Sequence, residues 1–217
     1  MQQSSLPKQY LKLAGRTVIE WSIAPFIEHA ACAGLVVVIS GDDAHWRNIP
    51  SSRDPRVRVV NGGQERSDSV LAGVTALRDQ CSDQEWVLVH DAARPCLEAA
   101  DLERLIDTLR EDLVGGLLAA PLVDTLKRAD DEQRVAATVS REKLWRALTP
   151  QMFRYGVLSR ALSEASRRGV PVTDEAQAVE LLNLKPRLVA GSADNFKITI
   201  PEDLARAARV LAERKSP

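Results

Sequence analysis

The alternation of strand-like apolar runs with helical segments constrains the fold of this chain most. Residues 35–39 form a continuous run of leucine, valine and isoleucine, as in strands that are buried on both faces of a parallel sheet. Residues 56–60 and 86–89 also have strand patterns, whereas residues 70–78 and 99–111 have helical spacing. The sequence therefore predicts an α/β fold with a mostly parallel sheet flanked by helices.

The pattern changes at Asp124. Residues 125–128 and 134–139 flank a polar turn and predict a hairpin-like arm. Such an arm has too little apolar surface to be stable alone, so we expect it to pack on a partner. We interpret residues 1–217 as one domain that carries this arm at about residues 124–148. Further strands are expected at residues 117–120 and 196–200, and further helices at residues 17–29, 154–168, 174–182 and 201–213.

Charge, hydropathy and cysteine content exclude several classes of protein. The formal net charge is -1, so nothing favours nonspecific binding to nucleic acid or to an anionic membrane. No apolar stretch approaches the roughly 20 residues of a membrane helix, and the N-terminus has no signal-peptide pattern. The 3 cysteines are widely spaced and odd in number, which is typical of reduced thiols in a cytosol. We expect a cytoplasmic protein.

Asp91 is the candidate metal ligand. It directly follows the strand pattern at residues 86–89, and ligands of open α/β sheets bind beyond the carboxyl ends of the strands. A single carboxylate with room for waters and substrate phosphates is a usual arrangement for magnesium. The alternative is that Asp91 caps a turn or pairs with Arg94. His90 is interpreted as a packed or hydrogen-bonding residue, because magnesium prefers oxygen ligands.

Three basic residues are candidates for binding phosphate, although a solvated surface charge is the alternative for each. Lys197 lies between Phe196 and Ile198, so a strand would place it on the face opposite these apolar side chains. Lys8 follows a proline, which disfavours a helix there and favours an exposed loop. Arg141 begins a short charged segment. Each of these signals is weak by itself.

Seven segments taken together resemble one family. In chain order they are PKQYL (residues 7–11), GGQERSDSV (62–70), VHDAARP (89–95), DTLKR (124–128), ALTPQ (147–151), TDEA (173–176) and DNFKIT (194–199). This order is similar to that of the 2-C-methyl-D-erythritol 4-phosphate cytidylyltransferases, over nearly the whole chain. The resemblance implies a Rossmann-like nucleotidyltransferase domain whose protruding arm builds a homodimer. It also implies the reaction, in which CTP and methylerythritol phosphate give the CDP-linked methylerythritol and pyrophosphate with magnesium.

The resemblance assigns catalytic roles. Lys8 would stabilise the transition state from the triphosphate side, and Asp91 would hold the magnesium ion. Lys197 and Arg141 would position the incoming phosphate. Because that phosphate is itself the nucleophile, catalysis would consist of positioning and charge stabilisation, and no nucleophilic side chain is needed.

The resemblance also assigns residues to the two substrates. Thr125 and Thr149 would donate hydrogen bonds to methylerythritol phosphate. In the family, the arm residues, here Thr125 and Arg141, serve the neighbouring subunit's site. The cytosine ring and the ribose would be contacted by Gly63, Gln64, Ser69 and Ala92. Gln64 stands where some relatives have aspartate, and its side-chain carbonyl can still accept a hydrogen bond from the base amino group.

The front of the chain departs from the family pattern. Family members carry an apolar strand and a loop resembling Ala-Ala-Gly-x-Gly-x-Arg-Met before the segment at residues 7–11. Met1 matches the methionine of that loop. We therefore expect that roughly 20 residues precede Met1 in the natural protein and supply a strand, a second arginine and a backbone cradle for the triphosphate. The coding frame upstream of Met1 tests this expectation.

Two alternatives remain open from the sequence. The first is a cytidylyltransferase for another polyol phosphate, such as ribitol phosphate. The second is a catalytically silent, dimeric nucleotide-binding paralogue. The departure at the front favours the silent paralogue, whereas retention of Lys8, Asp91, Arg141 and Lys197 disfavours it, because a silent protein has no physical need for all four.

Overall fold

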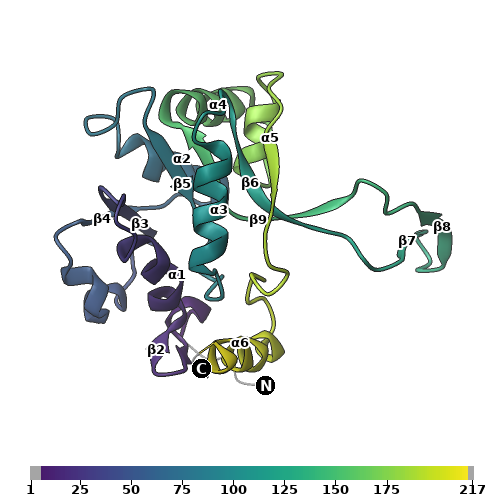
Figure 1. The fold of residues 1–217 in the computed structure, drawn as a ribbon, viewed down its shortest axis with the longest axis horizontal. Helices are drawn as coiled ribbons and strands as arrows, with labels where there is room; N and C mark the ends of the chain where they lie inside the picture. The colour runs from purple at the N-terminus through teal and green to yellow at the C-terminus, as the bar shows by residue number, and fades with distance from the viewer. Residues whose placement is uncertain (1–5, 215–217) are drawn as a thin grey trace.

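The computed structural model describes residues 6–214, so the expectation about Met1 lies outside the described residues. Figure 1 shows a mixed α/β body with a hairpin that projects to one side. A four-stranded sheet lies in this body. Its strand order is β10 (Arg187–Ala190), β6 (Gly115–Pro121), β9 (Trp145–Arg154) and β5 (Trp86–Val89).

The central sheet is mixed in direction, because β9 pairs antiparallel with both β6 and β5. β10 pairs parallel with β6, so three of the four strands run in one direction, as the prediction of a mostly parallel sheet requires. The sequence did not predict β9. Its residues Leu148 to Phe153 are all buried, so the strand lacks the alternation of apolar and polar residues, and Pro150 interrupts it.

A β-bulge distorts β9 where it passes β6. Ala147 pairs with Ala119 and Gln151 pairs with Leu117, so residues 148–150 of β9 lie opposite Leu118 alone. A bulge bends its strand and can redirect a side chain. Proline cannot donate a hydrogen bond to the ladder, and a bulge tolerates it because residues there leave the regular ladder. The bulge therefore explains why the backbone at Thr149 departs from the regular course of the strand.

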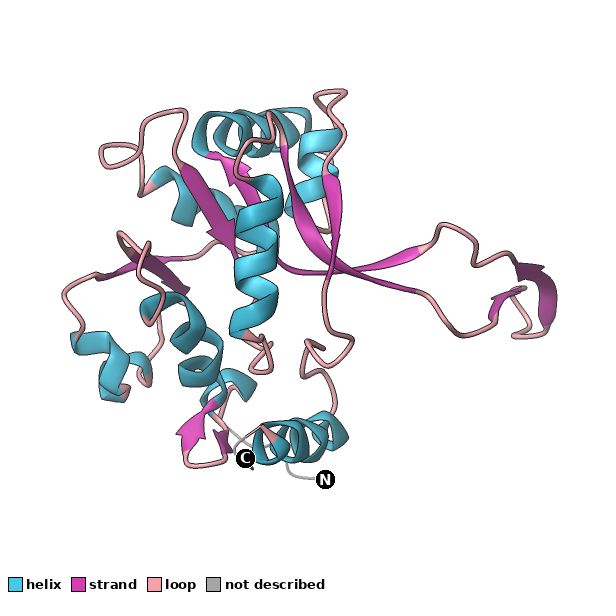
Figure 2. Ribbon diagram, viewed as in Figure 1, coloured by secondary structure: helices cyan, strands magenta, loops and turns pink. Residues whose placement is uncertain are grey.

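Two helical layers cover the sheet (Figure 2). On one face, Leu117 and Phe153 pack with a cluster from α2 (Arg66–Thr75), α4 (Tyr155–Arg168) and α5 (Glu175–Glu180). On the other face, Leu118 and Met152 pack with α3 (Ala99–Leu109). Neighbouring residues of each strand thus point to opposite layers, as the period of two requires.

A second parallel pair, β3 (Leu35–Ile39) and β4 (Val57–Asn61), forms a separate two-stranded sheet among the described residues. Helix α1 (Val18–Ile27) packs on it through Ile19 and Ile23. Around α1 lie the short hairpin β1 (Lys12–Leu13) and β2 (Arg16–Thr17), the closing helix α6 (Pro201–Glu213), and the 3-10 helices η1 (Lys8–Tyr10), η2 (Trp46–Asn48) and η3 (Pro50–Arg53).

The projecting hairpin consists of β7 (Leu126–Ala129) and β8 (Val135–Val139), close to the strands expected at residues 125–128 and 134–139. It continues from the ends of β6 and β9 that lie farthest from α4 (Figure 1). Most of its residues are exposed, and Val135 retains 65% of its accessible surface. The role of this arm in dimerisation stays a prediction.

Two expected elements differ in the structure. Residues 196–200 form no regular strand within the described part of the chain. Phe196 and Ile198 are buried as the alternation predicted, but Ile200 is exposed and Asn195 is buried, against the same alternation. A backbone hydrogen bond from Ile198 N to Ala93 O connects this segment to the loop after β5. Helix α2 begins at Arg66, four residues before the expected start at residue 70. Arg66 therefore lies in the first helical turn.

Candidate active site

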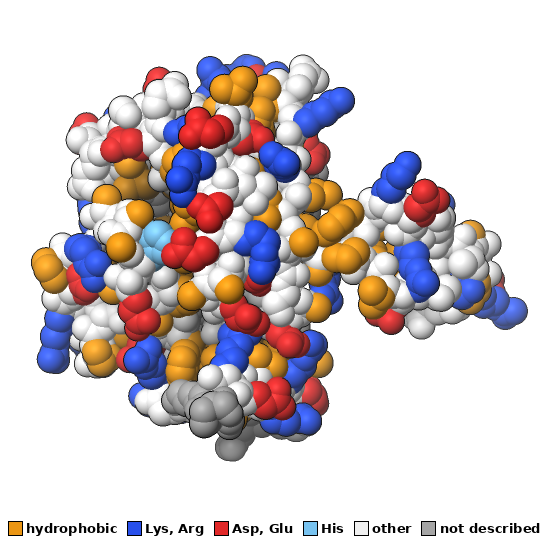
Figure 3. All heavy atoms as spheres, viewed as in Figure 1, with side chains coloured by type: hydrophobic (Ala, Val, Ile, Leu, Met, Phe, Trp, Pro, Cys, Tyr) orange, Lys and Arg blue, Asp and Glu red, His pale blue; other side chains and the backbone are white. Residues whose placement is uncertain are grey.

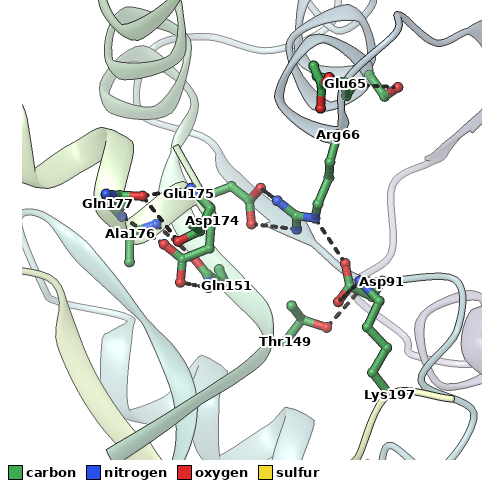
Figure 4. Close-up of polar contacts among 12 residues, drawn as sticks. Glu65, Arg66, Asp91, Thr149, Gln151, Asp174, Glu175, Ala176, Gln177 and Lys197 are labelled. Carbon is green, nitrogen blue, oxygen red and sulfur yellow. Dashed lines mark hydrogen bonds and ion pairs between the residues drawn. The ribbon is translucent and has the colours of Figure 1, made fainter. Parts of the chain in front are cut away.

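Three positively charged side chains surround the carboxylate of Asp91, which lies just after β5. Figure 4 shows two of them, Arg66 and Lys197. Arg66 Nε lies 3.2 Å from Oδ1, Arg94 Nε lies 3.2 Å from Oδ2, and Lys197 Nζ lies 3.3 Å from Oδ2. These four residues, which we term the Asp91 cluster, come from α2, the loop after β5 and the segment before α6. The ion pair with Arg94 was the structural alternative for Asp91, and it is present.

The positive charges keep Asp91 ionised. Burial by itself would raise the pKa of this carboxyl group, but the charges of Arg66, Lys197 and Arg94 outweigh burial and lower its pKa to about 2. Asp91 therefore carries a full negative charge at neutral pH. The cluster as a whole has an excess of positive charge, which suits an anionic ligand such as a phosphate group.

The bulge in β9 brings Thr149 to the strand end that carries Asp91. Thr149 Oγ1 accepts a hydrogen bond from Asp91 N at 3.1 Å and lies 2.9 Å from His90 Nδ1. His90 Nε2 lies 3.1 Å from the carbonyl oxygen of Arg94. Burial lowers the pKa of His90 to about 4, so the ring is neutral at pH 7. Nε2 must then donate to the carbonyl, and Nδ1 accepts from the Thr149 hydroxyl.

The segment that carries Lys197 is held against the loop after β5. Arg94 Nη1 donates to the carbonyl oxygen of Asn195 at 2.8 Å, and Asn195 Nδ2 donates to the carbonyl oxygen of Thr149 at 2.6 Å. Phe196 is buried on the next position along the chain. These hydrogen bonds and the burial of Phe196, instead of the expected strand, hold this segment in place and position Lys197 beside Asp91.

Arg66 also contacts a second carboxylate. Its Nη1 and Nη2 atoms donate to Oε1 and Oε2 of Glu175 at 2.6 and 3.2 Å, and the Glu175 side chain is only 1% exposed. Burial raises the pKa of Glu175, and the Arg66 charge opposes this shift. Sequence reasoning assigned no role to either residue. The signal was present, because both lie in the segments at residues 62–70 and 173–176, but nothing in the sequence shows that Glu175 is buried.

A loop precedes α2 and packs closely on its first turn. Ser69 Oγ accepts a hydrogen bond from Gly63 N at 3.2 Å and donates to the carbonyl oxygen of Glu65 at 3.2 Å. A Cβ atom at Gly63 would lie 2.3 Å from Asp68 Cβ, so only glycine fits this approach. Gly63, Gln64 and Ala92 are exposed. The carbonyl oxygen of Ala92 accepts a hydrogen bond from the Ser22 hydroxyl.

Comparisons with known proteins place the chain in one family. The model of the family described as IspD, 2-C-methyl-D-erythritol 4-phosphate cytidylyltransferase, matches residues 1–213.

The chain belongs to the IspD family.

Relatives and solved structures agree with this assignment. The 2-C-methyl-D-erythritol 4-phosphate cytidylyltransferase of Ectopseudomonas mendocina is 54% identical over 209 residues, which are 96% of this chain and 89% of the relative. A crystal structure titled 4-diphosphocytidyl-2C-methyl-D-erythritol synthase has a TM-score of 0.86 at 41% identity and covers 94% of this chain and 95% of its own. The Francisella tularensis IspD structure has a TM-score of 0.85 at 32% identity, with coverages of 94% and 93%.

The structure brings some of the residues implied by the IspD resemblance together and leaves others apart. Asp91, Lys197 and Thr149 meet at the Asp91 cluster. Thr125 and Arg141 are exposed on the arm, where Arg141 Nη1 donates to the carbonyl oxygen of Val123.

Lys8 is exposed in η1 and forms no ion pair within the described part of the chain. Its helix is held by the neighbouring Tyr10, whose hydroxyl donates to Asp43 Oδ2 at 2.7 Å. The chain by itself therefore brings together only part of the set of expected residues.

The described residues contain no group of three or more His, Cys, Asp or Glu side chains that could hold a metal ion. Asp91 is the candidate metal ligand that the sequence singled out, and its carboxylate is ionised as a cation would require.

No helix among residues 6–214 is long and apolar enough to cross a membrane.

Proposed function

We propose that this chain transfers CMP from CTP to 2-C-methyl-D-erythritol 4-phosphate and releases pyrophosphate. The observation that carries the proposal is the convergence of Arg66, Arg94 and Lys197 on Asp91 in a member of the IspD family. The relatives and the solved structures are named for this activity. An excess of positive charge beside one ionised carboxylate suits two phosphorylated substrates.

In the proposed reaction, a phosphate oxygen of methylerythritol phosphate attacks the α-phosphorus of CTP. The new phosphoanhydride bond forms as the bond to the β-phosphate oxygen breaks, and pyrophosphate leaves with the bonding electrons. No side chain forms a bond with either substrate. The chain's residues hold the two substrates in line and stabilise the negative charge of the transferred group and the leaving group.

Lys197 and Lys8 bind the phosphate groups of different substrates. Lys197 binds the phosphate of methylerythritol phosphate, and its 36% exposed side chain is accessible to an incoming ligand. Thr149 donates to the same substrate after its hydroxyl turns away from His90. Lys8 stabilises the negative charge of the triphosphate. Of the described residues, Asp91 is the one ion-pair partner of Lys197, so binding a phosphate exchanges one anionic partner for another.

The nucleoside part of CTP lies along the loop before α2. Gly63 and Gln64 are exposed and offer backbone and side-chain groups to the base. Ser69 and Ala92 complete this side of the site, from the first turns of α2 and from the loop that carries Asp91. The close packing of Gly63 on Asp68 supports this assignment, because it fixes the backbone groups that a base would contact.

Asp91 would hold a divalent cation that arrives with the triphosphate, and the ion would compete with the cationic side chains that contact this carboxylate. One ionised carboxylate is available, and both of its oxygens already contact cationic side chains. Magnesium is commonly held by one or two carboxylates together with substrate phosphates and water. In that arrangement Asp91 would hold the ion, which would supply positive charge beside the triphosphate.

The chain acts as a homodimer through its arm. Hydrophobic side chains gather where the arm leaves the body (Figure 3). The exposed apolar residues of this region include Val123 at 71%, Leu144 at 38% and Trp145 at 37% of their accessible surface. Contact with a second copy would bury them, and it would bring Thr125 and Arg141 of one subunit toward the phosphate site of the other.

Pyrophosphate release tests this function. The chain is incubated with CTP, magnesium and methylerythritol phosphate, and a second reaction contains ribitol phosphate as the acceptor. We expect release with methylerythritol phosphate and little with ribitol phosphate. Release with ribitol phosphate alone would assign the chain to another polyol phosphate, and no release with either acceptor would refute the proposed activity.

A further inference from the structure

Neither Arg66 nor Glu175 is assigned a contact with a substrate in the function proposed above. Glu175 is a buried carboxylate that receives both Nη atoms of Arg66, at 2.6 and 3.2 Å. Removing the Glu175 charge from water is costly, and well-packed apolar residues are often at least as stabilising as a buried ion pair. Stability alone is therefore a weak reason for this pair, and its position suggests a better one.

Arg66 connects two parts of the proposed site. It opens α2, two residues after Gln64 in the nucleotide loop, and its Nε atom contacts Asp91 at 3.2 Å. A guanidinium group is planar, so fixing both Nη atoms also fixes the direction of Nε. Glu175 therefore determines how Arg66 approaches Asp91 (Figure 4).

Glu175 is itself fixed in place by β9. Asp174 Oδ1 caps α5 by accepting from Gln177 N at 2.9 Å, and Asp174 Oδ2 accepts from Gln151 Nε2 at 2.9 Å. Gln151 Oε1 accepts from Ala176 N at 2.7 Å. The buried amide of Gln151 thus holds the residues on both sides of Glu175, and it lies two positions after Thr149 on the same strand.

We propose that Arg66 and Glu175 are positioning residues for the transfer reaction. They lock the loop before α2, which contacts the nucleotide, to Asp91 and to the β9 segment, which contacts the acceptor. This inference rests on the function proposed above. Because each half of the site keeps its own ligand contacts, loss of the pair lowers kcat and leaves the binding of CTP nearly unchanged.

Two substitutions of the pair test this inference. Glu175→Gln keeps the shape of the side chain but removes its charge. Arg66→Lys keeps the positive charge but removes the two Nη donors that bind both oxygens of Glu175. We expect kcat to fall by about 10- to 100-fold in both, since small misplacements of reacting groups have effects of this size. The dissociation constant of an α,β-methylene analogue of CTP, measured by calorimetry, should change by less than about threefold.

A surface pair on α4 supplies the matched control. Glu164 accepts hydrogen bonds from Arg167 Nε and Nη2 at 2.8 and 2.7 Å, so it has the same chemistry as Glu175 away from the Asp91 cluster. Glu164→Gln should retain the kcat of the unsubstituted chain. Thermal denaturation and gel filtration confirm that each variant is folded, and Arg66→Lys decides alone if Glu175→Gln does not fold.

The remaining outcomes each contradict the inference. An unchanged kcat in a folded variant would mean that the pair is only structural. An equal weakening of analogue binding would make Arg66 a nucleotide ligand instead of a positioning residue. These results are distinct from failure of the proposed function, because in that case the unsubstituted chain and Glu164→Gln would also release no pyrophosphate.

Discussion

At the scale of single residues, Lys197 is the side chain whose contacts point most directly to a substrate. Its ammonium group lies 3.3 Å from Asp91 Oδ2 and is partly exposed, whereas the two arginines of the cluster have second acceptors in Glu175 and Asn195. The arginines are thus anchored independently of Asp91. Lys197 is the cation that can exchange its partner at the lowest cost.

Lys197→Ala should therefore impair the use of methylerythritol phosphate far more than the binding of CTP. A hydrogen bond to a charged group contributes about 1.5–3 kcal/mol, so we expect the KM for the acceptor to rise by roughly 10- to 100-fold. The dissociation constant of the α,β-methylene analogue of CTP should stay within about twofold. Steady-state kinetics and calorimetry measure the two values. Lys185→Ala, in a loop after α5, is the control, and equal losses for both substrates would contradict the role of Lys197.

The sequence predicts single residues of the site unevenly. Asp91 could be placed because it follows an apolar strand, and Lys197 because it alternates with buried neighbours. Arg66 and Glu175 could not be paired, because their contact joins residues 109 positions apart and depends on how α2 and α5 both pack on α4. The local pattern of a charged residue does not reveal whether its partner is buried.

At the scale of elements, the start of α6 shows how one carboxylate fixes a helix that closes the fold. Asp203 Oδ2 accepts from Thr199 N at 2.8 Å, Thr199 Oγ1 at 2.9 Å and Ile200 N at 3.1 Å. The hydrogen bond from the Thr199 backbone is the main cause that lowers the pKa of Asp203 below its ordinary value. The same contacts connect α6 to the segment that carries Lys197.

Asp203→Asn should destabilise the fold by about 1 kcal/mol at pH 7, as loss of a helix-capping contact does. The folded pKa of Asp203 is depressed, so its stabilisation is fully present above the unfolded pKa of about 3.9 and is lost as the pH falls through the folded pKa. Urea denaturation at pH 7 and at acid pH measures this. The difference between the variant and the unsubstituted chain should shrink below about pH 4. A difference that stays constant over this range would contradict the assignment.

Elements with a clear hydrophobic pattern, either continuous or periodic, were predicted well, and irregular elements were not. The strands at residues 35–39 and 86–89 and the helix at residues 201–213 agree with β3, β5 and α6. Strand β9 was missed because Pro150 and its bulge break the pattern. Its two buried faces depend on neighbours that are distant in sequence, so tertiary packing and not local propensity determines it.

At the scale of the whole molecule, the arm separates two groups of proposed active-site residues. Thr125 precedes β7 and Arg141 follows β8, whereas the Asp91 cluster lies beside β5 and α2 in the body. Figure 1 shows the hairpin of β7 and β8 projecting from this body. In a two-fold symmetric dimer, each site would combine the body of one subunit with the arm of the other. Subunits with different defects could then form one intact site between them.

Mixing Lys8→Ala subunits with Arg141→Ala subunits should therefore restore activity that neither variant has alone. Random pairing makes half of the dimers mixed, and one of the two sites in each mixed dimer is intact, so we expect about a quarter of the full activity. Pyrophosphate release after co-expression measures the recovery. The double variant Lys8→Ala/Arg141→Ala mixed with the unsubstituted chain gives the reference. No recovery above the single variants would contradict the sharing of sites.

The hydrogen bonds around Asp91 form a closed ring. Asp91 N donates to Thr149, Thr149 donates to His90, His90 donates to the carbonyl of Arg94, and Arg94 Nε donates back to the Asp91 carboxylate. Each donor in this cycle has a single acceptor, and the neutral His90 ring allows only one direction. A ligand that receives the Thr149 hydroxyl proton therefore opens this ring at His90 Nδ1, and the other three hydrogen bonds of the ring can remain in place.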